Sequence, residues 1–245
     1  MSDRPGLLIT RPATTAAAFA QDVQAQMGSD VDIVISPILT ISSIPLTLDV
    51  KQYPTLIFTS AHAVRAVASS TKQRDFICYA VGGATSDCAA REGFNVREGG
   101  GTGDALARRI IGDRPSAPCL YLRGKHIAYD LAGTLSSAGI ETQEMVVYDQ
   151  QETDLNPEAI DFLASGRPVI LPLFSARSAT LFFDRYTATG PLDVVAMSRK
   201  IAATIPPSSV RHLRVCARPT AEAMVSETAI LLRGTNQLEG RPSPK

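Results

Sequence analysis

The sequence repeats itself once, and this repeat constrains the fold more than any other feature. The segment 7–11 (LLITR) resembles 120–124 (LYLRG), and 56–63 (LIFTSAHA) resembles 171–178 (LPLFSARS). A third pair, 80–82 and 196–198, follows in the same order, each pair at a spacing of about 115 residues. Two such copies nearly fill the 245-residue chain. A period this long is unlike that of a solenoid and indicates a duplicated domain.

Short apolar runs alternate with amphipathic stretches along both copies. Runs at 7–10, 31–36, 56–59, 77–81 and 119–122 predict strands, and stretches at 13–27, 61–69, 84–91 and 104–111 predict helices. Strands that are apolar on both faces and alternate with helices indicate parallel sheets covered on both sides. The sequence therefore predicts an α/β fold of two doubly wound parallel-sheet lobes that arose by internal duplication.

Composition excludes several classes of protein. Lys and Arg total 24, and Asp and Glu also total 24, which argues against a general nucleic-acid binder. No apolar run reaches the roughly 18 residues of a membrane span. We see no signal peptide at the polar N-terminus and expect a cytoplasmic protein. The four Cys and three His lack the close pairs of a zinc site, so we expect reduced thiols, no metal and no cofactor.

Several loops that follow the predicted strands carry small, hydroxyl or basic residues. In parallel α/β sheets ligands bind beyond the carboxyl ends of the strands, where helix N-termini attract anions. The candidate binding residues are Arg11, Thr59, Ser60, Gly82, Thr85, Arg123, Gly124, Lys125, Ser175 and Ser198. In any single loop a Ser or Thr is more simply explained as a helix cap. Because such loops recur in both halves, we expect a shared anionic ligand in a cleft between the lobes.

Two familiar chemistries lack their motifs. The glycine-rich run 99–103 has no Gly-Lys-(Ser/Thr) of a phosphate loop, so it predicts a flexible loop before a helix. Ser60 has no GxSxG elbow around it, so a serine hydrolase is poorly supported. The polar stretch 234–245 predicts a disordered C-terminus.

Seven motifs in order resemble those of bacterial uroporphyrinogen-III synthases. They are ITRP at 9–12, LIFTSAHAV at 56–64, AVGGAT at 80–85, GTGDAL at 101–106, LYLRG at 120–124, VVY at 146–148 and RPTAEAM at 218–224. The resemblance covers residues 7–232. Three motifs depart from the family pattern: His62 replaces the usual Asn, 174–178 reads FSARS instead of FTSPS, and 198–201 (SRKI) lacks the usual Gly and Thr.

The resemblance implies a chain path that composition alone does not show. One lobe is discontinuous and is expected to comprise residues 1–38 and 151–245, while residues 39–150 form the other. Strands at 38–44 and 145–150 are expected to form a two-stranded connector.

The resemblance also implies a reaction. A lyase of this family, in porphyrin and heme biosynthesis, converts hydroxymethylbilane to uroporphyrinogen III, inverting the last pyrrole ring through a spiro intermediate. The linker tyrosine, Tyr148, is the candidate catalytic acid, since a phenol with a pKa near 10 is protonated at neutral pH. Alternatively, Tyr148 only packs as an aromatic strand residue.

The resemblance leaves the partners and one alternative function open. We expect a monomer that takes hydroxymethylbilane as substrate and that contacts hydroxymethylbilane synthase transiently, with no membrane or nucleic-acid partner. The divergent 198–201 motif also permits a non-catalytic two-lobed homologue that binds a linear tetrapyrrole or another anionic small molecule. A periplasmic-type solute receptor is a third possibility, against which the missing signal peptide argues.

Overall fold

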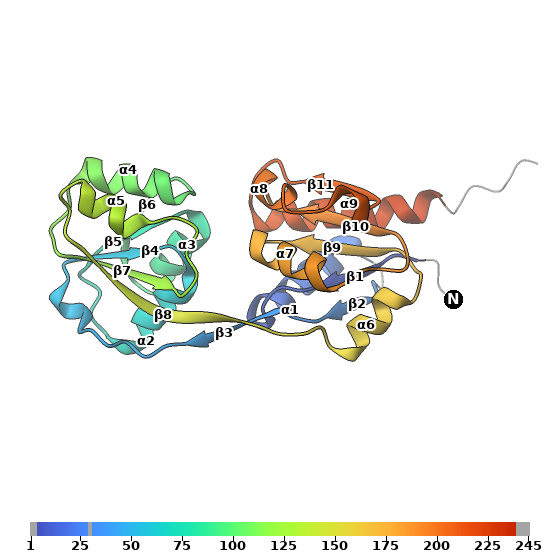
Figure 1. Cartoon of the computed structure of the whole chain (residues 1–245), viewed down its shortest axis with the longest axis horizontal. Coiled ribbons are helices and arrows are strands. Elements are labelled where there is room, and N and C mark those ends of the chain that lie inside the picture. The colour runs from blue at the N-terminus through green and yellow to red at the C-terminus, as the bar shows by residue number, and fades with distance from the viewer. Residues whose placement is uncertain (1–3, 29–30, 239–245) are drawn as a thin grey trace, which may run out of the picture. The chain divides into compact units, whose positions relative to one another are not determined.

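The computed structural model describes residues 4–28 and 31–238 (Figure 1). The chain forms two compact units, one of residues 1–40 with 152–245 and the other of residues 41–151. Both units have parallel sheets covered by helices, so the predicted α/β class is confirmed. The family resemblance implied chain crossings at 38/39 and 150/151, and the contacts of the structure place them at 40/41 and 151/152.

The discontinuous unit contains a five-stranded sheet in the order β11-β10-β9-β1-β2, paired in parallel throughout. Its strands are β1 (Gly6–Ile9), β2 (Ile33–Ile35), β9 (Val169–Leu173), β10 (Leu192–Ala196) and β11 (His212–Val215). Every residue of β1, β9 and β10 is buried, because helices cover both faces of these central strands.

Side chains of alternating direction divide the core of this unit into two layers. Leu7 and Ile9 pack with residues of α1 (Ala13–Met27) and α9 (Ala221–Leu238). Leu8 packs on the other face with residues of α6 (Pro157–Ala164), α7 (Ala176–Arg185) and α8 (Arg199–Ala202). A short 3-10 helix, Pro207–Ser209, precedes β11.

The continuous unit contains a six-stranded sheet in the order β3-β8-β7-β4-β5-β6. Its strands are β3 (Leu39–Ser43), β4 (Thr55–Phe58), β5 (Ile77–Ala80), β6 (Asn95–Glu98), β7 (Cys119–Gly124) and β8 (Thr142–Glu152). The helices α2 (Ala61–Ser70) and α3 (Gly83–Arg91) cover the face that contains Phe58. The helices α4 (Gly103–Asp113) and α5 (Leu131–Ser137) cover the face that contains Ile57. A 3-10 helix, Val50–Gln52, precedes β4.

Strands β3 and β8 are the two segments that cross between the units. The Ile44 N–H donates to the Val147 carbonyl at 2.9 Å, and the Thr153 N–H donates to the Ile38 carbonyl at 3.0 Å. Because residue numbers rise along one strand as they fall along the other, this pair is antiparallel. The expected two-stranded connector is therefore present as the edge of the six-stranded sheet.

The strand orders of the two units are equivalent. Read from β4 onward, the continuous unit has the spatial order third-second-first-fourth-fifth, with β3 added at the edge. The discontinuous unit has the same order when it is read from β9 through β11 and then from β1 to β2. The segments matched by the sequence repeat, which form β1 and β7, β4 and β9, and β5 and β10, therefore occupy equivalent places.

The ends of the chain show one agreement and one correction. The helix predicted at 13–27 is α1, and Gly28 ends it in the left-handed conformation at φ 60°, donating to the Gln24 carbonyl. The disorder predicted from Gly234 onward is wrong up to Leu238, because α9 continues to that residue. The remainder of that prediction, 239–245, lies outside the described residues. None of the described helices has the length and apolar character needed to cross a membrane.

Candidate functional site

In each unit the strand order reverses at one point, and the predicted binding residues lie along the carboxyl edge of the sheet on either side of it. The reversal falls between β4 and β7 in the continuous unit and between β9 and β1 in the discontinuous unit. Open α/β sheets bind ligands outside the carboxyl ends of the strands at such a switch point. The carboxyl edge of the continuous unit carries Thr59, Ser60, Gly82, Thr85, Arg123, Gly124, Lys125 and Tyr148; that of the discontinuous unit carries Arg11, Ser175 and Ser198.

Tyr148 lies directly over Gly124. The two residues are partners in the β7–β8 register, next to an irregularity between Arg123 and Gly124. A Cβ on Gly124 would lie 2.6 Å from Cζ and 2.8 Å from the hydroxyl oxygen of Tyr148, so this approach requires glycine. The phenol ring is buried, yet its hydroxyl forms no hydrogen bond to another described residue and is not sealed from solvent. The hydroxyl of Tyr148 is therefore available to a ligand.

A second tyrosine, Tyr121 on β7, holds the side chain of Thr59. Its hydroxyl lies 3.1 Å from Thr59 Oγ1. Burial raises the pKa of Tyr121, and the hydrogen bond with Thr59 opposes this shift in part. Tyr121 was not predicted as a site residue, because a single apolar strand motif does not show which side chain follows the neighbouring strand.

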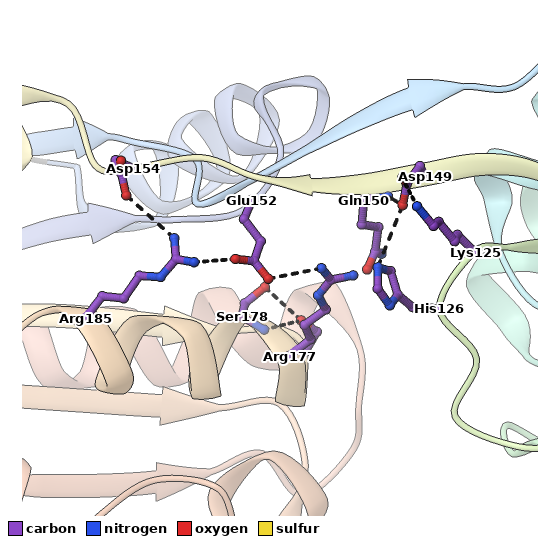
Figure 2. Close-up of polar contacts among 10 residues, drawn as sticks. Lys125, His126, Asp149, Gln150, Glu152, Asp154, Arg177, Ser178 and Arg185 are labelled. Carbon is purple, nitrogen blue, oxygen red and sulfur yellow. Dashed lines mark hydrogen bonds and ion pairs between the residues drawn. The ribbon is translucent and has the colours of Figure 1, made fainter.

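The basic residues of the β7 corner are engaged with carboxylates. Arg123 binds Glu144 through Nε at 2.9 Å and Nη2 at 3.2 Å, while its Nη1 donates to the Gly124 carbonyl at 3.0 Å. Lys125 Nζ lies 3.4 Å and His126 Nε2 lies 3.7 Å from Asp149 (Figure 2). These contacts compensate the charges that the sequence assigned to an anionic ligand, and they fix the β7–β8 corner.

Three of the predicted hydroxyls cap helices. Ser60, Ser175 and Ser198 accept hydrogen bonds from the second or third N–H of α2, α7 and α8, at 3.2, 3.0 and 3.4 Å. Capping therefore accounts for their position, as the alternative interpretation held. Because a cap uses the serine oxygen as acceptor, the O–H can still donate, and Ser175 donates its proton to Ser178 at 2.8 Å.

At the start of α3 two backbone segments lie close together. Gly82 is its N-cap, and a Cβ there would lie 3.1 Å from the Cα of Gly101. Thr85 is the third residue of the helix and is buried. The first N–H groups of α3 therefore face the same carboxyl edge as Ser60.

Arg11 is the cation predicted as a binding residue at the edge of the discontinuous unit. Its guanidinium carbon lies 3.8 Å from the centroid of the Phe174 ring and 5.8 Å from that of Phe19. Its Nε is buried without a hydrogen-bond partner, and burial lowers the pKa of Arg11. A guanidinium stays charged in such surroundings, so this site favours an anion that completes its hydrogen bonding.

Ion pairs also connect the end of β8 to α7. Glu152 contacts Arg177 Nη2 at 3.4 Å and forms a closer pair with Arg185, which also lies 3.6 Å from Asp154 (Figure 2). The sequence motif around Arg177 gave no sign of this pairing, since Glu152 lies 25 positions away along the chain.

Within the part of the chain that the structure describes, no group of three His, Cys, Asp or Glu residues could hold a metal ion. Cys78, Cys88, Cys119 and Cys216 are free and buried. The carboxyl edges thus offer hydroxyls, backbone N–H groups and a guanidinium, which suit an anionic organic ligand.

The fold defines a class of two-domain α/β proteins with a strand switch point in each sheet, the place at which open α/β sheets bind ligands. The family model of uroporphyrinogen-III synthase HemD matches residues 23–226. No individual curated protein matches the chain in sequence. Because the family match spans well over half of its length, the chain belongs to the uroporphyrinogen-III synthase family, whose members are lyases of heme biosynthesis.

Two solved structures show the same fold. Uroporphyrinogen-III synthetase from Helicobacter pylori 26695 aligns with a TM-score of 0.67 and 19% identity, over 93% of this chain and 99% of that chain. A mutant uroporphyrinogen III synthase from Thermus thermophilus aligns with a TM-score of 0.55 and 13% identity, over 95% of this chain and 99% of that chain.

Proposed function

We propose that this chain closes hydroxymethylbilane to uroporphyrinogen III with Tyr148 as the acid. The reaction of the family begins with loss of the terminal hydroxyl, which leaves an electrophilic azafulvene. The last pyrrole then attacks through its substituted carbon to give a spiro intermediate, and fragmentation and recombination invert that ring. One proton must reach the leaving hydroxyl so that it departs as water.

The observation that carries the proposal is the free hydroxyl of Tyr148 over Gly124 at a switch point. The O–H of a phenol is a hydrogen-bond donor, and no described residue occupies that of Tyr148. General acid catalysis contributes roughly 10²–10⁴ to a rate. In this role Tyr148 donates to the leaving oxygen and recovers a proton when the final pyrrole carbon loses its own.

The edge of the discontinuous unit has a different role in this proposal. Arg11, with a buried and unpartnered Nε, and the N-termini capped by Ser175 and Ser198 supply donors to substrate carboxylates. These interactions are formed with substrate and transition state alike, so they set KM more than kcat. In the continuous unit, Thr59, Ser60, Gly82 and Thr85 are proposed to bind carboxylates beside the acid, and the corner of Arg123, Gly124 and Lys125 holds the tyrosine.

We further propose that the protein works as a monomer in the cytoplasm and receives hydroxymethylbilane by transient contact with hydroxymethylbilane synthase. Because a free linear bilane closes by itself, direct transfer from one enzyme to the other would reduce this uncatalysed closure. Mixing the two purified proteins and measuring isomer yield against their concentrations tests this step.

The product isomer tests the function. Hydroxymethylbilane closes without an enzyme to the type I isomer, so the coupled reaction with hydroxymethylbilane synthase reports which path dominates. We expect mainly type III when this protein is present. Only type I product, despite measured binding of the bilane, would instead establish the non-catalytic homologue.

A further inference from the structure

His62 occupies one of the three places at which the chain departs from the family motifs, and it contacts the proposed acid. It is the second residue of α2, and its ring centroid lies 5.4 Å from that of Tyr148 at an interplanar angle of 48°. Tyr148 is thus approached by two elements, by β7 through the Cα of Gly124 and by α2 through the His62 ring. Neither contact is a hydrogen bond to the hydroxyl of Tyr148.

The surroundings of His62 favour the uncharged imidazole. Partial burial lowers the pKa of His62, and Arg65 one turn along the helix lowers it further. Among the described residues no carboxylate forms an ion pair with His62 that would offset these effects. A neutral imidazole packs against a phenol as an aromatic pair and brings no positive charge that would favour the phenolate.

From these contacts we infer that His62 is a positioning residue for Tyr148, holding the phenol ring over Gly124 in one orientation. This inference rests on the proposed function for its catalytic consequence, though the contact itself does not. The buried ring and the missing hydrogen bond explain why a second aromatic side chain matters. With nothing to anchor the hydroxyl, only ring packing limits rotation of the phenol. An asparagine at this place has no aromatic face to provide that packing.

The kinetic experiment compares two substitutions of His62 in the full-length protein. His62→Phe keeps an aromatic ring and His62→Ala removes it, while Ser69→Ala on the exposed side of the same helix is the control. We expect His62→Ala to lower kcat by about tenfold with KM changed less than twofold, because a misplaced catalytic group loses rate and not affinity. His62→Phe and Ser69→Ala should keep kcat within about twofold of the wild type. An equal loss of kcat in His62→Ala and His62→Phe, or no loss in either, would overturn the inference.

A second measurement follows the Tyr148 ring without any turnover. NMR of protein with ring-labelled tyrosine reports how fast the Tyr148 ring flips. The Tyr148 signals are assigned as those missing from the spectrum of Tyr148→Phe. We expect slow flipping in the wild type and in His62→Phe, and fast, averaged signals in His62→Ala. Equal flipping in all three would contradict the positioning role even if the enzyme is active. If the wild type made only type I product while the ring behaved as expected, the proposed function would fail and the positioning contact would remain.

Discussion

The two units have one strand order but obtain it from different paths of the chain. The continuous unit takes its sheet from residues 41–151, whereas the sheet of the other unit combines strands from both ends of the sequence. The switch point of the latter lies between β9 and β1, which are about 160 residues apart in sequence. The switch point of the continuous unit is therefore formed by segments within one stretch of sequence. That of the discontinuous unit forms only when segments from the two ends of the chain come together.

The edges differ in chemistry as well. The edge of the continuous unit has a phenol with a free hydroxyl beside an imidazole, while that of the other unit has a guanidinium on an aromatic ring. The phenol lies on β8 and the guanidinium follows β1, so the two groups lie at strands that are one place apart in the repeated order. In the proposed function the phenol donates a proton and the guanidinium binds an anion. The two sheets thus share a strand order, while the side chains along their carboxyl edges differ.

The largest expected effect concerns the independence of the two units. The fragment 41–151 should fold alone, with a cooperative thermal transition in circular dichroism. The fragment 152–245 should not fold alone, because it lacks β1, which pairs with β9. The β1 residues Leu7, Leu8 and Ile9 are fully buried. A rearranged chain should fold again if it begins with residues 152–245 and continues, through a flexible linker, with residues 4–40.

Cooperative unfolding of 152–245 by itself would contradict this difference between the units. It would mean that β9, β10 and β11 form a stable sheet without the N-terminal strands. A disordered fragment 41–151 would equally contradict it, since that unit would then depend on its partner.

The next largest effect is on stability at the β7–β8 corner. Gly124→Ala places a methyl group 2.6 Å from the Tyr148 ring, and the resulting overpacking should lower the free energy of unfolding by about 1–3 kcal/mol. Gly112→Ala in α4 is the matched control, since nothing lies within 4 Å of its added Cβ and a helical alanine is favoured. Urea denaturation of both variants measures the difference, and equal stabilities would show that Tyr148 does not press on Gly124.

A smaller effect is expected from the pH dependence of stability. The pKa of His62 is lower in the folded than in the unfolded state, so below about pH 6.5 the unfolded chain binds more protons. The stability of the wild type should therefore fall as pH decreases through this range, toward the folded-state pKa. His62→Phe should show a shallower decline, measured as the urea midpoint between pH 7.5 and pH 5. Parallel declines in the two proteins would assign the pH dependence to other groups.

The central strands could be predicted from sequence because burial on both faces produces apolar runs. The edge strands β6 and β11 could not, since Asn95–Glu98 and His212–Val215 are mostly exposed and have no such run. Only the family resemblance indicated that strands from both ends of the chain join in one sheet. Within a unit nothing in composition indicates which segment supplies a neighbouring strand.

The site was predictable only to the extent that it follows strand ends. Hydroxyl and basic residues after apolar runs were found in this way. The contacts of Tyr121 with Thr59 and of His62 with Tyr148 were not, because they join side chains 62 and 86 positions apart. The carboxylate partners of Arg123 and Lys125 were missed for the same reason.

The division of roles between the two edges is tested most directly by a paired measurement of kcat and KM for type III formation. Tyr148→Phe should lower kcat by roughly 10²–10⁴ and leave KM nearly unchanged. Arg11→Met keeps the apolar contact with Phe174 but removes the charge, and loss of one charge-assisted hydrogen bond should raise KM by roughly tenfold to a hundredfold with kcat nearly unchanged. The opposite pattern, with Arg11→Met lowering kcat and Tyr148→Phe lowering it less than about threefold, would contradict this division of roles.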